Sequence, residues 1–120
     1  MPCINSTKFG EIIIDGKKYQ QVLIVGDSVS ERDSQRLEKL FNTTHKIAEW
    51  EIDSLFQKNP EIILIGTGQD GMLEVSKDLL EKVKKANIEL ITDFTPKIVE
   101  IYNEKNKAGK QVNALIHTTC

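Results

Sequence analysis

A glycine-rich segment is the feature of this sequence that most suggests chemistry. The residues GTGQDG at 66–71 follow directly after the apolar run IILI at 62–65. Glycine lets backbone amides approach a bound group closely, and amides together with a hydroxyl form a cradle for anions. The loop is either a tight turn that needs glycine at positive φ or a ligand site. As a functional site, it is predicted to bind a small anionic or polar ligand through Gly66, Thr67, Gly68 and Gly71.

The same segment matches the G-x-G-x-x-G pattern of dinucleotide-binding proteins. Asp93 lies 22 residues beyond Gly71, near the position of the acid that binds a ribose in such proteins. However, the helical pattern begins near Ser76, so the positive end of that helix would not face a phosphate held by the glycines. A nucleotide binder is therefore the weaker alternative, and we expect no cofactor.

The residues His117 and Cys120 suggest a second kind of chemistry. An imidazole can lower the pKa of a thiol, so Cys120 could act as a nucleophile or redox thiol with His117 or His45 as its base. In an extended chain His117 and Cys120 lie about 10 Å apart, at ~3.3 Å per residue, and point to opposite faces. We therefore predict no metal site.

Two further side chains have both a structural and a functional interpretation. His45 follows two threonines and precedes a predicted helix, where it either pins the local loop or places its ring near the glycine loop. In the second case it would act as an acid, a base or an anion donor. Trp50 lies at the margin of an apolar helical stripe, so it either contacts a partner or covers the edge of the core.

The first half of the chain is expected to open with an antiparallel ribbon. Residues 11–19 predict a hairpin with Asp15 and Gly16 in a type I′ turn, and the run VLIV at 22–25 predicts a buried strand. The polar stretch from 28 to 35 follows. Helical spacing then predicts a short helix that buries Leu37, Leu40 and Phe41, and a second helix at about 48–58 with the inward set Ala48, Ile52, Leu55 and Phe56.

Strands and helices alternate in the second half. Strands are expected at 62–65, 88–92 and 112–116, with a helix capped by Ser76 and another that starts at Thr95 as N-cap and stops at Gly109. Because strand, helix and strand in one sheet normally run parallel, this half predicts a parallel sheet. Together with the antiparallel ribbon, the class is α/β with a mixed sheet.

Composition limits the remaining possibilities. A chain of 120 residues with 28% charged and 39% hydrophobic residues predicts one globular domain over residues 1–120. The net charge of -2 disfavours nucleic acid as a partner. The longest apolar run has four residues, and no signal peptide is visible, so we expect no membrane partner and a cytoplasmic protein with reduced cysteines.

The order of these motifs resembles the Mth-type domain of unknown function over essentially the whole chain. The motifs are Phe9-Gly10, THKI at 44–47, PEIILIGTG at 60–68, Tyr102-Asn103 and HTTC at 117–120. The resemblance implies a three-layer α/β domain with a mixed central sheet and an extra N-terminal β ribbon. It implies no established reaction, although eukaryotic members, among them a mitochondrial respiratory complex I assembly factor, are linked to assembly or regulation.

Between Ser28 and Asn42 this chain departs from those relatives. It has a charged, helix-like stretch where they carry a tryptophan-containing strand, so any partner surface of theirs in that region is not transferred.

Our leading hypothesis is a non-catalytic binding or assembly module that uses the glycine loop and His45 toward a protein partner or a small anionic or polar ligand. The thiol enzyme remains the alternative. If the strands that end at Ile65 and Ile116 reach the same edge of the sheet, Thr67 and His117 can share a site.

Overall fold

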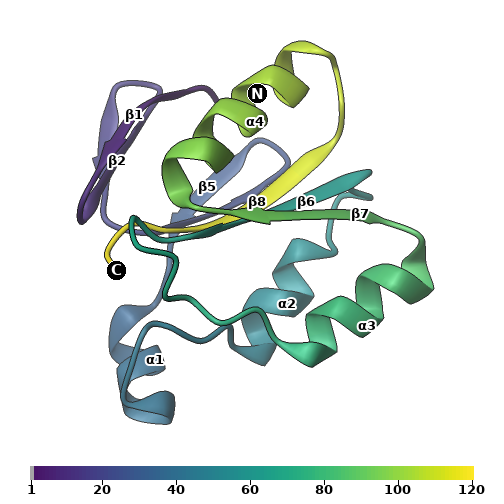
Figure 1. Cartoon of the computed structure of the whole chain (residues 1–120). Helices are drawn as coiled ribbons and strands as arrows, with labels where there is room; N and C mark the ends of the chain where they lie inside the picture. The colour runs from purple at the N-terminus through teal and green to yellow at the C-terminus, as the bar shows by residue number, and fades with distance from the viewer. Residues whose placement is uncertain (1) are drawn as a thin grey trace.

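A five-stranded mixed sheet divides the molecule into two layers of side chains (Figure 1). The structure is a computed structural model that describes residues 2–120. The strand order is β5-β4-β8-β6-β7, with β4 and β5 antiparallel and β8, β6 and β7 mutually parallel. The strands are β4 (Val22–Val25), β5 (Ser28–Glu31), β6 (Ile62–Thr67), β7 (Glu89–Asp93) and β8 (Val112–His117).

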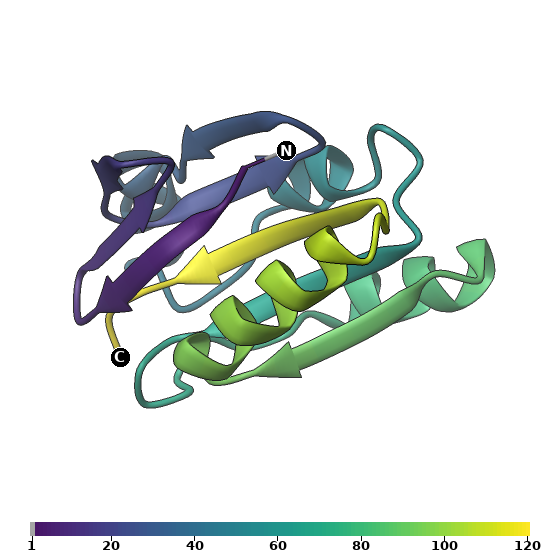
Figure 2. The same cartoon turned by 90° about the horizontal axis from the view of Figure 1, so that it is seen from above.

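The predicted ribbon is present and forms a separate three-stranded sheet. It consists of β1 (Ile4–Lys8), β2 (Glu11–Ile14) and β3 (Lys17–Tyr19) in antiparallel order. Asp15 and Gly16 have φ values of 50° and 80°, as a type I′ turn requires at both central positions. The ribbon lies beside α4 (Thr95–Lys107), so the two together cover one face of the main sheet (Figure 2).

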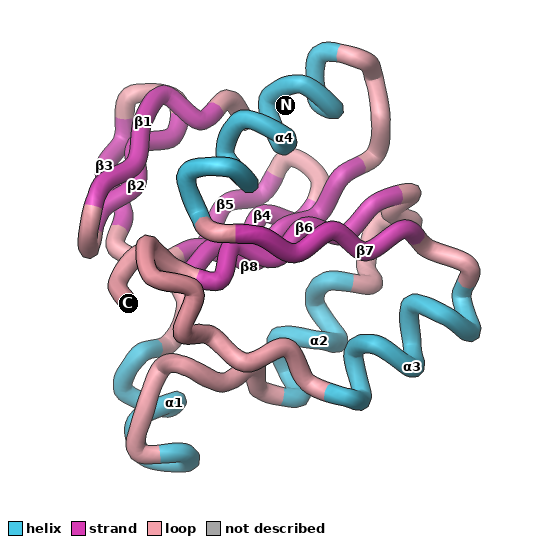
Figure 3. Tube along the Cα trace, viewed as in Figure 1, coloured by secondary structure: helices cyan, strands magenta, loops and turns pink. Residues whose placement is uncertain are grey.

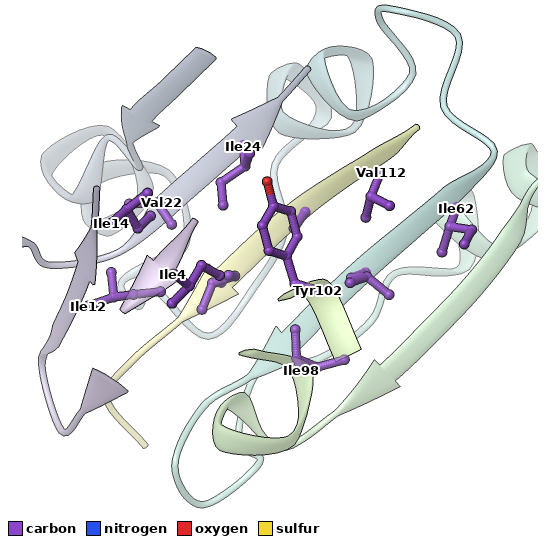
Figure 4. Packing of buried hydrophobic residues seen from close by; sticks show 12 residues of the cluster. Ile4, Ile12, Ile14, Val22, Ile24, Ile62, Ile98, Tyr102 and Val112 are labelled. Atoms are coloured by element: carbon purple, nitrogen blue, oxygen red, sulfur yellow. The ribbon is translucent and has the colours of Figure 1, made fainter. Parts of the chain in front are cut away.

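The opposite face is covered by α2 (Glu49–Leu55) and α3 (Lys77–Ala86), which completes the three layers predicted from the family resemblance. Side chains alternate along the strands, so Ile62 and Leu64 pack in the cluster with Ile98 and Tyr102 of α4 (Figure 4). Ile63 lies in the cluster on the other side. Burial on both faces explains why these strands read as unbroken apolar runs.

The segment from 28 to 35 corrects the helix-like interpretation. Its first four residues form β5, which pairs with β4 from Val25↔Ser28 to Val22↔Glu31. The polar residues of β5 fit because it is an edge strand whose side chains are mostly exposed, so pairing with β4 outweighs the low strand propensity of Ser28, Ser30 and Glu31.

The helix α1 (Ser34–Phe41) begins only after β5 and stands apart below the sheet, between two loops (Figure 3). Leu37 is its one fully buried side chain, whereas Leu40 is 61% exposed. The expectation that Leu40 packs inward is therefore wrong. Helical periodicity correctly identified an apolar stripe on α1. However, α1 packs against the rest of the protein mainly through Leu37, so Leu40 stays exposed.

The helix α2 ends at Leu55, before the predicted end near residue 58. The ends of α3 and α4 follow the predictions with one exception. The Ser76 hydroxyl accepts a hydrogen bond from the Leu79 amide at 3.2 Å, as an N-cap does, and Gly109 follows the end of α4 with φ 77°. Thr95 is not the N-cap of α4: Phe94 holds that position, and Thr95 is fully buried. The Thr95 hydroxyl bonds to the ends of two strands instead.

Within residues 2–120, no helix combines the length and the apolar character that crossing a lipid bilayer requires.

Candidate functional site

The strands β6 and β8 end at the same edge of the sheet. They are parallel neighbours, and Thr67 pairs with His117 at their last position. The strand β6 is two residues longer than the predicted 62–65, so Gly66 and Thr67 belong to the strand and the loop begins at Gly68. The glycine loop and the C-terminal residues 118–120, here called the tail, therefore leave the sheet side by side.

Three glycines of the segment make room for other parts of the protein. A β-carbon on Gly66 would lie 2.9 Å from the Thr95 hydroxyl, and one on Gly68 would lie 2.5 Å from the carbonyl carbon of Cys120. At Gly71 it would lie 2.5 Å from the Phe94 ring. Gly68 and Gly71 also have φ values of 107° and 73°, which other residues rarely adopt. Close packing and turn geometry thus account for all three.

The tail occupies the amides of the loop. The Gln69 amide donates to the Thr119 carbonyl at 2.8 Å. The Asp70 and Met72 amides both donate to the main-chain oxygen of Cys120, at 3.1 and 2.9 Å. The expected open cradle for an anion is therefore filled by the protein itself, and an external ligand would reach these donors only by displacing the tail.

The remaining polar groups at the start of the loop are also engaged. The Thr67 hydroxyl donates to the Asp93 carbonyl at 3.0 Å, and the Gly68 amide donates to the Thr95 hydroxyl at 3.0 Å. The Thr95 hydroxyl in turn donates to the carbonyl of His117. Thr95 thereby links α4 to the ends of both β6 and β8.

The buried side chain of His117 has a defined tautomer. Its Nδ1 lies 2.6 Å from the side-chain oxygen of Gln21, which also accepts from Arg32 at 2.9 Å. Because that oxygen can only accept, Nδ1 carries the proton of a neutral ring. The lone pair is then on Nε2, which faces the Thr119 hydroxyl at 3.2 Å and accepts its hydrogen bond.

Burial lowers the pKa of His117 from 6.5 to about 4, and its electrostatic interactions with Arg32 and His45 add to the effect. The ring is therefore neutral at physiological pH. A base with so low a pKa is poorly matched to a cysteine thiol, whose ordinary pKa is about 8.5. This weakens His117 as the base of a thiol enzyme.

His45 makes contacts that belong to both of its interpretations. Its amide donates to the Thr43 hydroxyl at 3.0 Å, and its carbonyl accepts from the Glu74 amide at 2.8 Å. Its ring stands edge-on to the ring of His117, with centroids 5.1 Å apart. His45 thus both anchors the segment after the glycine loop and lies against the residue that contacts the tail.

A buried ion pair, which the sequence interpretation missed, supports this end of the sheet. Arg32 donates to both carboxylate oxygens of Glu51, at 2.7 and 2.9 Å, and both side chains are fully buried. Its other N–H groups donate to Gln21 and to the carbonyls of Thr44 and Lys46, so all five donors are satisfied.

One signal for the pair was present in the sequence. Glu51 lies three residues after Ala48 and therefore on the inward face of its helix, where a charge requires a partner. Nothing local identified Arg32 as that partner.

Other features of the surface lie elsewhere. A hollow of about 690 Å³ opens at the opposite end of the sheet, between the β4–β5 turn and the chain before β6. None of the predicted site residues lines it. No cluster of three or more His, Cys, Asp or Glu suited to a metal ion occurs in residues 2–120.

The low pKa of His117 predicts an acid-dependent loss of stability. The unfolded chain binds a proton near pH 6.5 and the folded chain only near pH 4, so stability falls as the pH decreases between these values. Solvent near this end of the sheet screens part of the electrostatic effect. The free energy of unfolding should therefore fall by an amount on the order of 2 kcal/mol. Urea unfolding from pH 7.5 to 4 measures it.

The matched control is His117→Asn, which keeps an N–H donor toward Gln21 but does not titrate. Its unfolding free energy should vary less with pH over the same range. An identical pH dependence of the variant and the wild type would exclude the assignment.

Comparison with known proteins gives a consistent result. A family model described as a protein of unknown function (DUF498/DUF598) matches residues 4–117. The solved structure of a protein named MT938 is 28% identical, with a TM-score of 0.79 and 100% of both chains covered. The conserved hypothetical protein PH1505 from Pyrococcus horikoshii OT3 is 27% identical, with a TM-score of 0.83 and 98% of each chain covered.

A more distant structure agrees in fold alone. A Mth938-like domain from Bordetella pertussis is 12% identical, with a TM-score of 0.62, and the match covers 97% of this chain and 85% of that one.

Proposed function

Because this chain belongs to the DUF498/DUF598 family of proteins of unknown function, we propose its role from its own surface: it is a protein-binding module that docks a partner at the edge where the glycine loop meets the tail. The supporting observation is a group of three exposed apolar side chains around the tail, Phe9, Met72 and Phe94, here called the apolar rim. Their exposed fractions are 60%, 54% and 55%.

Backbone contacts bring the rim together. Phe9 precedes Gly10, whose amide donates to the Thr118 carbonyl at 3.0 Å. Met72 donates its amide to the tail, and the Phe94 ring packs over Gly71. Large apolar side chains gathered at one place, with polar groups between them, are typical of protein interfaces.

The occupied loop favours a protein over a small anion as the partner. The amides and the hydroxyl that would hold an anion are already bonded within the chain, whereas the rim side chains have more than half of their surface available. Fully satisfied polar groups add little to binding, and apolar area removed from water contributes about 25 cal/mol per Å².

Replacing the rim tests the proposal. We expect the double variant Phe9→Ser, Phe94→Ser to lose captured partners that the wild type retains from cell extract, because it removes the apolar area of the interface. Leu80→Ser is the matched control, since Leu80 is also an exposed apolar residue, at 47%, but lies on α3. Quantitative mass spectrometry of the captured proteins is the measurement.

Site-specific crosslinking makes the test positional. A photoreactive phenylalanine analogue at position 94 should crosslink the same protein that the double variant loses, and the analogue at position 80 should not. If the rim variant and the control capture the same proteins in the same amounts, the rim is not a docking surface.

A further inference from the structure

The helix α1 and the start of α2 form a second surface with a distinct composition. A hollow of about 270 Å³ is lined by Arg36, Lys39, Leu40 and Trp50, here called the α1 groove. It contains two cations, two large apolar side chains and no acid. None of its residues belongs to the apolar rim, so an inference about the groove does not rest on the role proposed for the rim.

Helix geometry separates the groove from the acidic residue of α1. At about 100° per residue, Arg36, Lys39 and Leu40 lie within an arc of about 100° on one side of the helix. Leu37 faces the body and is fully buried. Glu38 lies about 160° away from both Arg36 and Leu40 and about 100° away from Lys39, and it does not line the groove.

The cations of the groove are available for a partner. Neither Arg36 nor Lys39 forms a side-chain ion pair within residues 2–120. The guanidinium of Arg36 stacks on the Trp50 ring, 3.9 Å from its centroid. Stacking uses the flat face of the group and leaves its N–H edge free for a carboxylate, in a position that the indole has already ordered.

The walls of the groove are held in place from below. The buried Arg32 donates to the carbonyls of Thr44 and Lys46, which lie in the segment that joins α1 to α2. At the other end of α1, the Asp33 carboxylate accepts from the Arg36 amide as an N-cap. The groove is therefore preorganised although α1 itself has little contact with the core.

We propose that the α1 groove binds an acidic, leucine-containing segment of a protein partner. Carboxylates pair with the edge of Arg36 and with Lys39, while an apolar side chain packs against Leu40 and the exposed part of Trp50. Arginine and tryptophan together are the composition most enriched in interface hot spots. A nucleic acid is disfavoured because the chain carries a net charge of -2 and Arg36 already covers a face of the indole.

Trp50 is the only tryptophan, so its fluorescence reports on the groove directly. The probe is a short blocked peptide of Asp, Glu and Leu, titrated into the protein at low salt. We expect saturable changes in the emission of Trp50 that weaken as salt is raised. The same peptide with Lys in place of its acids, the peptide with Ala in place of Leu, and a single-stranded oligo-dT are the comparison probes.

Exposed side chains can be changed without loss of the fold. The double variant Arg36→Gln, Lys39→Gln should bind the acidic peptide about tenfold more weakly, since each surface charge contributes up to about 1 kcal/mol. Leu40→Ala should weaken it about threefold to tenfold. The matched control is Lys84→Gln, Lys85→Gln, which removes two exposed lysines of α3 and should bind normally.

Absence of saturable binding by the acidic peptide, equal binding of the lysine peptide, or binding of oligo-dT alone would overturn the proposal. The rim variant Phe9→Ser, Phe94→Ser should bind the peptide as the wild type does. Loss of peptide binding in the groove variants alone supports the α1 groove whether or not the apolar rim captures a partner.

Discussion

Replacing Glu51 with alanine is expected to lower the free energy of unfolding by about 3–5 kcal/mol, because Arg32 then remains charged and buried with no counter-charge. The exposed fractions of both side chains are 0%, so bulk water does not solvate either charge in the folded protein. The Ala48 amide, which donates to the same carboxylate at 3.0 Å, loses its acceptor as well. Urea unfolding at pH 7 measures the change.

Asp53→Ala is the matched control for this prediction. Asp53 lies on the same helix and pairs with Lys82 at 3.4 Å, but both side chains are about half exposed or more. Such a pair contributes at most about 1 kcal/mol. If Glu51→Ala lowers the free energy of unfolding by no more than Asp53→Ala does, the buried pair of Arg32 and Glu51 does not have the stabilising role assigned to it.

Replacing Gly68 with alanine is expected to expel the tail from the loop. The new β-carbon would lie 2.5 Å from the backbone of Cys120 and 2.8 Å from the His117 ring, at a backbone φ of 107° that alanine avoids. Backbone strain and overpacking together are expected to lower the free energy of unfolding by about 2–4 kcal/mol. Where the tail moves instead, the Gln69, Asp70 and Met72 amides lose their acceptors.

Hydrogen exchange and thiol reactivity distinguish these effects. Exchange of the three amides should accelerate, and Cys120 should react faster with a thiol reagent than it does in the wild type. Gly109→Ala is the control, because Gly109 also has a positive φ, 77°, but has open space around its missing side chain. Gly109→Ala should lower the free energy of unfolding by only about 1 kcal/mol. The Gln69, Asp70 and Met72 amides should stay protected from exchange in that variant. Equal behaviour of both variants would contradict the tail contact.

Arg32 connects the two candidate surfaces. Through Gln21 it reaches His117, whose ring accepts from Thr119 of the tail, and through the Thr44 and Lys46 carbonyls it fixes the segment that carries the α1 groove. Polar groups buried in a connected set are strongly interdependent, since each loss leaves a neighbour unsatisfied. Faster hydrogen exchange of the Gln69, Asp70 and Met72 amides, which donate to the tail, in Glu51→Ala would therefore report on the same support.

Local sequence patterns alone determined most of the strands and helices of this protein, whereas its three layers were expected from the family resemblance. Apolar runs on both sides of Pro60 predicted strands buried on two faces, Asp15 and Gly16 predicted the ribbon turn, and Ser76 predicted the start of α3. These features depend on neighbouring residues, because burial periodicity and backbone dihedrals are expressed within a few positions of the chain. The edge strand β5 was missed, since three of its four residues are polar and have little strand preference, and it pairs only because β4 lies beside it.

Which groups meet at the candidate site was decided only by the tertiary structure. The glycine pattern at 66–71 was visible, but its explanation lies in Thr95, Cys120 and Phe94, which approach it from other elements. Arg32 meets Glu51 across 19 positions, and His117 meets Gln21 across 96. Such contacts follow from the order of strands in the sheet, and a local sequence pattern carries no information on that order. A local pattern shows that a buried charge or amide needs a partner. The fold determines which partner that group finds.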